Sequence, residues 1–135
     1  MKHILLLFVV TFALFSCGNN TSRKAQVTTE TKQSDCLEVL YFHGKQRCIT
    51  CNAIEKLAKE VVDSLNNNKI VLKVIDISKA ENEAIADKYE VTWSSLILDR
   101  GGKIEDLTEM GFSYAKNSPE EFKSKLLDSI NKMQR

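Results

Sequence analysis

The chain has 135 residues, of which 43% are hydrophobic and 27% are charged, as expected for one small globular domain. Its 19 Lys and Arg residues nearly balance 18 Asp and Glu residues, and removal of Lys2 with a leader makes the balance even. A net charge near zero excludes the basic surface that nucleic acids require and a polybasic membrane patch. Nucleic acid is therefore rejected as a partner.

The N-terminal segment has the pattern of an export signal. Lys2 and His3 form a short basic start, residues 4–15 are apolar, and Ser16 precedes Cys17. The apolar run is too short to span a bilayer as a helix. Residues 14–18, Leu-Phe-Ser-Cys-Gly, resemble the lipobox of bacterial lipoproteins, which implies cleavage before Cys17 and acylation of its thiol. Ordinary secretion with cleavage nearby is the alternative.

Either route leads out of the cytoplasm, into a compartment where disulfides persist. We therefore expect an extracytoplasmic protein, anchored through a lipid on Cys17 to a bacterial membrane and facing the periplasm. Residues 1–16 are the predicted signal peptide. Residues 17–35 are polar, with almost nothing apolar to bury, and are predicted to be a tether. Residues 36–135 form the predicted folded domain.

Strand and helix patterns alternate along this domain. The elements expected are a strand at 37–42, a helix at 52–65 stopped by three asparagines, a strand at 70–77, a helix at 81–89, a strand at 95–98, a tight turn at 99–102, a strand at 103–110 and a last helix from 119. Ser118 and Glu121 predict a capping box, with Pro119 at the first helical position. The last helix is expected to bury Phe122, Leu126, Leu127 and Ile130.

The order β-α-β-α-β-β-α defines an α/β fold with a four-stranded mixed sheet. The first half requires a parallel pair joined by a right-handed crossover, and the second half supplies an antiparallel hairpin. Helices are expected on both faces of the sheet, because the central strands have too little polar surface to face water. The run at 70–77 is β-branched and nearly continuous, as in a strand covered on both faces.

Cys48 and Cys51 carry the chemistry of this chain. They lie between the first strand and the first long helix, so Cys48 is expected at or just before the first helical turn. Unpaired N–H groups and the helix dipole favour a thiolate there, as do the cations of Lys45 and Arg47. Cys51 shares a helical face with the apolar residues Ile54, Ala58, Val61 and Leu65. One sulfur is therefore expected to be exposed and activated, and the other sheltered within bonding reach.

A Cys-x-x-Cys pair after the first strand of such a unit is typical of thioredoxin-like redox proteins, and residues 37–133 resemble a compact thioredoxin-like domain. More closely, residues 39–51, VLYFHGKQRCITC, and residues 53–56, AIEK, resemble the nitrophenyl compound nitroreductase ArsF family of Bacteroidales. This resemblance implies the fold, the dithiol and a link to arsenic or nitroaromatic chemistry. The sequence itself contains no recognisable flavin site.

The resemblance also identifies two departures. Thioredoxins place a cis-proline before the third strand, facing the dithiol, and Ser94 is its counterpart here. A non-proline cis bond costs about 2.5–4 kcal/mol, so a trans or distorted loop is expected. Trp93 and Ser94 of this loop are the predicted substrate-binding residues, although packing is the commoner role for such a tryptophan. The buried aspartate of thioredoxins is replaced by Tyr41 or Phe42, with His43 or water left to move protons.

The sequence predicts a thiol–disulfide oxidoreductase in which Cys48 is the nucleophile and Cys51 resolves the mixed disulfide. Its partners would be protein or small-molecule disulfides and a separate electron donor or acceptor, with no cofactor and no metal. The alternatives are capture of a soft ion such as arsenite or Cu(I), and a static disulfide. Cys36 is expected about 20 Å from the dithiol, at the other end of the first strand, and therefore not to join it.

Overall fold

The computed structural model describes residues 35–135. The predicted signal peptide, the lipidation site Cys17 and nearly all of the predicted tether lie outside this range. The elements are, in chain order, β1 (Leu37–His43), α1 (Ile49–Leu65), β2 (Ile70–Asp76), the 3-10 turn η1 (Ala80–Asn82), α2 (Glu83–Lys88), β3 (Ser95–Arg100), β4 (Lys103–Asp106), α3 (Thr108–Tyr114) and α4 (Pro119–Gln134). Within residues 35–135, no helix has the length and apolar character needed to cross a membrane.

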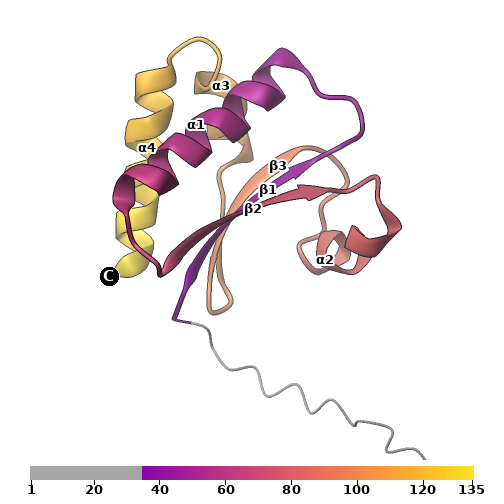
Figure 1. The fold of residues 1–135 in the computed structure, drawn as a ribbon, viewed down its shortest axis with the longest axis horizontal. Coiled ribbons are helices and arrows are strands. Elements are labelled where there is room, and N and C mark those ends of the chain that lie inside the picture. Colours follow the sequence, from indigo (N-terminus) through magenta and orange to yellow (C-terminus); the bar gives the residue numbers. More distant parts are fainter. Residues whose placement is uncertain (1–34) are drawn as a thin grey trace, which may run out of the picture. The chain divides into compact units, whose positions relative to one another are not determined.

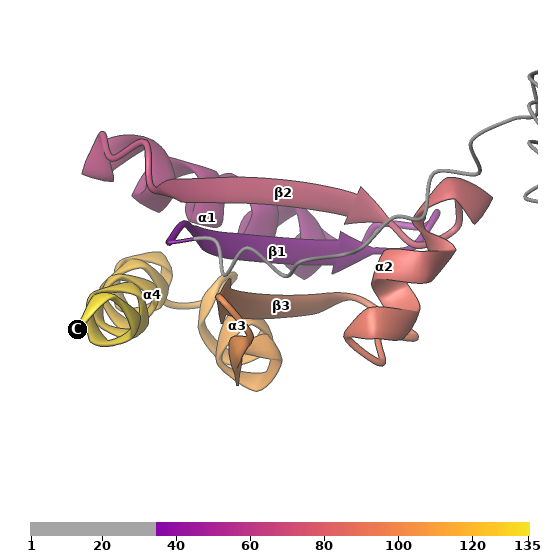
Figure 2. The same cartoon turned by 90° about the horizontal axis from the view of Figure 1, so that it is seen from below.

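The four strands form one mixed sheet in the order β2-β1-β3-β4. β1 runs parallel to β2 and antiparallel to β3, and β4 pairs back on β3 through the Gly101–Gly102 turn. Figure 2 shows β2, β1 and β3 side by side in this order. The predicted α/β fold with a parallel pair and an antiparallel hairpin is confirmed, and β1 is a central strand that delivers the chain to the two cysteines.

Helices cover both faces of the sheet, as predicted. Leu37, Val39 and Tyr41 alternate along β1 and pack with α1, α3 and α4 in the larger core. Leu40 and Phe42 point to the other face, where α2 and the loop after it cover a smaller core. In Figure 1, α1 lies above the sheet and α2 below it. Burial of β1 residues on both faces of the sheet fixes the position and direction of the segment that follows the strand.

The prediction that residues 70–77 form a strand covered on both faces is wrong. β2 is an edge strand, and its Val71 and Val74 are 40% and 43% exposed. β-branched residues suit any pleated strand, so an apolar run does not specify a central position. Lys73 interrupts the run and pairs with Glu38 on β1. A lysine in the middle of an edge strand discourages pairing with another chain.

The helix α3 (Thr108–Tyr114) was not predicted from the sequence. The strand predicted at 103–110 ends at Asp106, whose carboxylate oxygen Oδ1 accepts the Thr108 N–H at 2.8 Å and starts the helix. Gly111 lowers the helix propensity of this segment, which hid the helix from pattern analysis. Gly111 nevertheless suits this position, because a Cβ here would lie a tight 3.3 Å from Cδ1 of Ile54 on α1, and the Ile54 side chain would have to shift. Packing of α3 against α1, and not local helix propensity, therefore determines that this segment is a helix.

The helix ends agree only partly with prediction. Asn66 ends α1 in the left-handed conformation, with φ of 44°, as the asparagine run suggested. Pro119 is at the start of α4 as predicted, but Ser118 makes no side-chain capping hydrogen bond, so the capping box is wrong. Leu127 is only partly buried, whereas the C-terminal Met133 is buried. The helix predicted at 81–89 is divided into η1 and α2.

Candidate active site

Cys48 and Cys51 are joined in a disulfide at the start of α1, with Cα atoms 5.0 Å apart. Cys48 is the N-cap residue, and its Sγ accepts the backbone N–H of Cys51 at 3.0 Å. Cys48 is exposed, whereas Cys51 is 5% exposed and faces the core. The expected pair of one accessible and one sheltered sulfur is confirmed. The N–H that reaches Cys48 Sγ is one of the donors that a helix start leaves without a partner.

Tyr41 supports the dithiol from below. Its side chain is fully buried, and its hydroxyl donates to the backbone carbonyl of Cys51 at 2.8 Å. Burial raises the pKa of the Tyr41 phenol, although the nearby Arg47 and Ser94 act in the opposite direction. The phenol is therefore a neutral donor at physiological pH, and it ties the sheet to the first turn of α1.

The loop before β3 brings Ser94 and Trp93 to the site. The Ser94 hydroxyl oxygen lies 3.9 Å from Cys51 Sγ, and in the disulfide only the hydroxyl can donate across this contact. Residues 35–135 contain no cis peptide bond, so the trans backbone expected at Ser94 is confirmed. Trp93 stacks on Phe112 of α3, with ring centroids 5.6 Å apart, yet stays 61% exposed. It both packs and presents an aromatic surface.

Solved structures share this architecture. Part of human ERp44 aligns with a TM-score of 0.54 and 17% identity over 78% of this chain and 30% of that chain. Trxlp from Edwardsiella tarda gives 0.53 and 17%, covering 73% of this chain and 88% of that one. Thioredoxin from Fasciola hepatica gives 0.53 and 19%, covering 76% and 85%. The chain has a thioredoxin-like fold.

The narrower resemblance to the ArsF family has no support in these comparisons. No protein-family model matches the sequence, and a search of curated proteins gives no match. The three structures named above are each less than 25% identical to this chain, so their likeness concerns the fold. The chain spans about a third of the length of ERp44. What can be argued further about activity depends on the site's own geometry.

Arg47 is less available to the thioredoxin-like dithiol than the sequence suggested. Its guanidinium forms an ion pair with Glu55 on the next turn of α1 and lies 6.0 Å above the Tyr41 ring. Glu55 compensates much of the positive charge that was expected to favour a Cys48 thiolate. Of the groups expected to favour a thiolate, the start of α1 is the one that the structure shows in contact with Cys48, through the Cys51 N–H.

His43 ends β1 and is half-buried. Its Nδ1 lies 3.0 Å from the carbonyl oxygen of Gly44, a contact that requires the proton on Nδ1. The ring centroid lies 6.1 Å from that of Tyr41. This local hydrogen bond gives the His43 ring a structural role at the end of β1.

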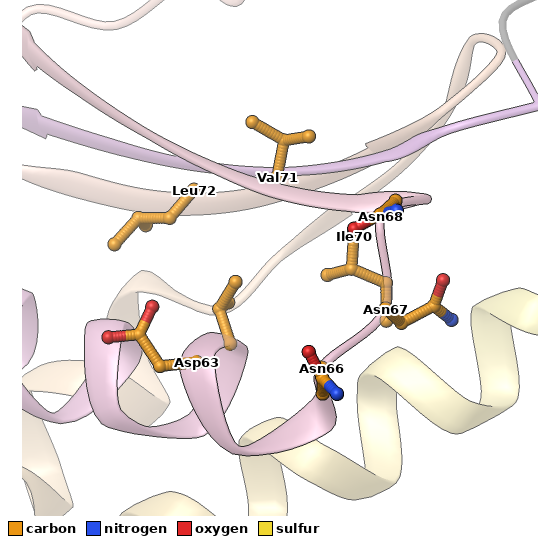
Figure 3. A pocket seen from close by; sticks show the side chains of 8 residues that line it. Asp63, Asn66, Asn67, Asn68, Ile70, Val71 and Leu72 are labelled. Carbon is orange, nitrogen blue, oxygen red and sulfur yellow. The ribbon is translucent and has the colours of Figure 1, made fainter.

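Cys36 is partly exposed and unbonded, directly before β1, so all of β1 separates it from the Cys48 end of the strand. The expectation that it does not join the dithiol is confirmed. No group of three or more His, Cys, Asp or Glu side chains in the described part of the chain is arranged to hold a metal ion. A hollow of about 620 Å³ lies at the far end of α1, between that helix and β2, and contains no thiol or histidine (Figure 3).

Two contributors to the site escaped the sequence analysis. The Tyr41 hydroxyl was not expected to bond the backbone of Cys51, because nothing in the sequence specifies the rotation of β1 beneath α1. Phe112 was missed with its helix. Its position directly after Gly111, beside an exposed tryptophan, becomes apparent only when α3 is in place.

Proposed function

We propose that this protein is a thiol–disulfide oxidoreductase in which Cys48 is the nucleophile and Cys51 the resolving cysteine. The observation that carries the proposal is the position of Cys48 Sγ, exposed at the start of α1 and hydrogen-bonded to the N–H of Cys51. The same hydrogen bond stabilises a thiolate once the disulfide is reduced, because charge-assisted hydrogen bonds are the stronger ones. A purely structural disulfide does not require an exposed sulfur.

The exchange proceeds in two balanced steps. The Cys48 thiolate attacks one sulfur of a partner disulfide, which forms a mixed disulfide and releases the other partner sulfur as a thiolate. Cys51 then gives up its proton to solvent and attacks Cys48 Sγ, which closes the Cys48–Cys51 bond and releases the second partner thiolate. Two electrons pass to the partner, and a separate thiol reductant must restore the dithiol. The reverse sequence oxidises a partner dithiol.

The substrate class is protein or small-molecule disulfides, and this thiol exchange involves only sulfur atoms. The direction follows from the reduction potential of the couple. A reduction potential of about −270 mV indicates a reductant, and one of about −120 mV indicates an oxidant. The Cys51 N–H at the start of α1 and the Ser94 hydroxyl contact the sulfurs, and their dipoles contribute to this potential.

We infer from the pattern of residues 1–17 that the protein works outside the cytoplasm, held on a membrane through a lipid at Cys17. Disulfides persist in that compartment, which suits a dithiol that cycles. Metabolic labelling with a fatty acid tests the anchor. Incorporation in the natural chain that is lost in Cys17→Ala supports it, and equal labelling of both chains contradicts it.

Arsenite or Cu(I) capture is the competing hypothesis, linked to the resemblance of residues 39–51 to the arsenic-associated family. Two adjacent thiols bind soft ions, but Cys36 lies beyond the opposite end of β1 and supplies no third thiolate in one chain. Titration of the reduced protein with arsenite separates the two hypotheses. Tight binding together with no disulfide exchange would favour capture.

The decisive experiment traps the mixed disulfide. Cys51→Ala is incubated with an oxidised model disulfide, and the adducts are located by peptide mass spectrometry. We expect a stable adduct on Cys48, because the resolving thiol is absent. Cys48→Ala is the matched control and should give far less adduct on Cys51, which is buried. Equal adducts in the two variants, or none in either, would contradict the proposal.

A further inference from the structure

A hollow of about 480 Å³ opens beside the exposed face of Trp93. It is lined by Trp93, Asp106, Thr108, Glu109, Phe112 and Ser113. Its aromatic side is the stacked pair of Trp93 and Phe112. Aromatic side chains that line a hollow offer a large rigid surface on which an apolar side chain of another molecule can pack.

This hollow is close to the dithiol. Trp93 directly precedes Ser94, whose hydroxyl oxygen lies 3.9 Å from Cys51 Sγ. α3, which carries Phe112, packs on α1 through Gly111 and Ile54, one turn after Cys51, and Figure 1 shows the two helices side by side. An extended partner joined to Cys48 would therefore bring residues that neighbour its cysteine towards the hollow.

The hollow is also negatively charged. Asp106 and Glu109 are both exposed and line it. Neither takes part in an ion pair with any cation of residues 35–135. The Asp106 carboxylate uses one oxygen to accept the Thr108 N–H, and carboxylates have capacity for further donors. A cation from outside the chain would satisfy both groups.

We propose that this hollow selects the partner, by binding an apolar side chain next to a lysine or arginine in the segment around the partner's reacting cysteine. The inference rests on the proposed function and names its substrate class. The apolar side chain packs on Trp93 and Phe112, while the cation lies between the two carboxylates and the face of the tryptophan. An acidic segment at this place is repelled by Asp106 and Glu109.

The test measures rates of thiol exchange with the reduced protein. One peptide carries a cysteine, as a mixed disulfide with mercaptoethanol, followed a few positions later by Phe-Lys. A second peptide carries Phe-Glu, a third carries Ala-Lys, and bis(hydroxyethyl) disulfide serves as a small neutral probe. The peptide lysine can pair with the exposed Asp106 and Glu109, whereas the peptide glutamate is repelled by them. The Phe-Lys peptide should therefore react faster than the Phe-Glu peptide by roughly three- to ten-fold at low ionic strength. In about 1 M salt, where the Debye length is about 3 Å, the ratio should approach one.

Variants assign the effect to the hollow. Asp106→Asn with Glu109→Gln should remove the charge preference, and Asn retains the oxygen that accepts the Thr108 N–H. The matched control is the double variant Asp87→Asn with Glu81→Gln, which changes two exposed acids around α2. It removes the same amount of negative charge away from the hollow and should leave the charge preference intact. Trp93→Ala should slow the Phe-Lys peptide to the rate of the Ala-Lys peptide.

The outcomes separate this inference from the proposed function. Equal rates for the Phe-Lys and Phe-Glu peptides, with normal reaction of bis(hydroxyethyl) disulfide, would overturn the inference alone. A preference that survives the Asp106 and Glu109 changes would overturn it too, as would a Trp93→Ala variant that still reacts faster with the Phe-Lys peptide than with the Ala-Lys peptide. Failure of all four disulfides to react would instead overturn the proposed exchange activity.

Discussion

Replacement of Tyr41 by phenylalanine tests how the sheet holds the dithiol. The change removes one hydroxyl and leaves the aromatic ring in the larger core. That hydroxyl donates to the Cys51 carbonyl at 2.8 Å and has no access to water. The carbonyl lies inside α1 and keeps its helical partner, so no acceptor becomes unsatisfied.

The expected cost follows from this geometry. A buried neutral hydrogen bond contributes about 0.5–1.5 kcal/mol net, and no further desolvation penalty applies here. In a domain of roughly 100 residues, a loss of about 1 kcal/mol lowers the unfolding midpoint by about 4–8 °C. We expect Tyr41→Phe to unfold at a temperature lower by that amount at neutral pH.

The effect should depend on pH in a defined direction. Burial raises the pKa of Tyr41 above its usual value of 10.0. The unfolded chain therefore loses the phenol proton first, and the stability that Tyr41 contributes is complete below pH 10 and is lost as pH rises through the folded pKa. The difference between the natural protein and Tyr41→Phe should hence shrink above pH 10.

Thermal unfolding of the oxidised protein by circular dichroism, at pH 7 and again above pH 10, measures both effects. Tyr114→Phe is the matched control, because the Tyr114 hydroxyl has no hydrogen-bond partner among the described residues, and it should change the midpoint little. Equal midpoints for Tyr41→Phe and the natural protein at pH 7 would refute the argument. So would a difference that stays constant to high pH.

Three further predictions concern the site, the core and the second face of the sheet. In the reduced protein at mildly acidic pH, iodoacetamide should label Cys48 well before Cys51, as peptide mapping would reveal, and equal rates would contradict the assigned roles. Phe122→Ala should cost about 3–5 kcal/mol in urea unfolding, because the ring is fully buried, and a loss below about 1 kcal/mol would refute the packing. Burial tends to raise the pKa of Asp99. Two hydrogen bonds, from the Tyr89 hydroxyl and the Gly102 N–H, oppose burial together with the nearby Lys88 cation, and they hold this pKa below the usual 3.8. The stability from Asp99 is thus present above that pH and lost as pH falls through the folded pKa, and Tyr89→Phe should reduce this acid sensitivity in unfolding measured from pH 7 downward.

Local sequence patterns were sufficient to predict a feature where the chemistry of one residue determines the local backbone structure. The Cys48 cap, the left-handed Asn66 and the Pro119 helix start are each set by the chemistry of a residue and its immediate neighbours. Patterns failed where the outcome depended on a distant element. Gly111 is unfavourable in an isolated helix but suits this one, because a side chain at this position would press on Ile54 of α1. Ser118 has the right identity for a cap but makes no such bond.

The sequence by itself determined the α/β order, the placement of the two thiols at a strand-to-helix junction, and which sulfur faces water, since hydrophobic period and helix-end chemistry act over a few residues. Only the tertiary structure decided that β2 lies at the edge, that α3 exists, that Tyr41 bonds the Cys51 carbonyl, that Ser94 lies beside Cys51 Sγ, and that Trp93 stacks on Phe112. These features arise from contacts between segments far apart in the chain. Such contacts depend on how whole elements pack, and no local pattern encodes that packing.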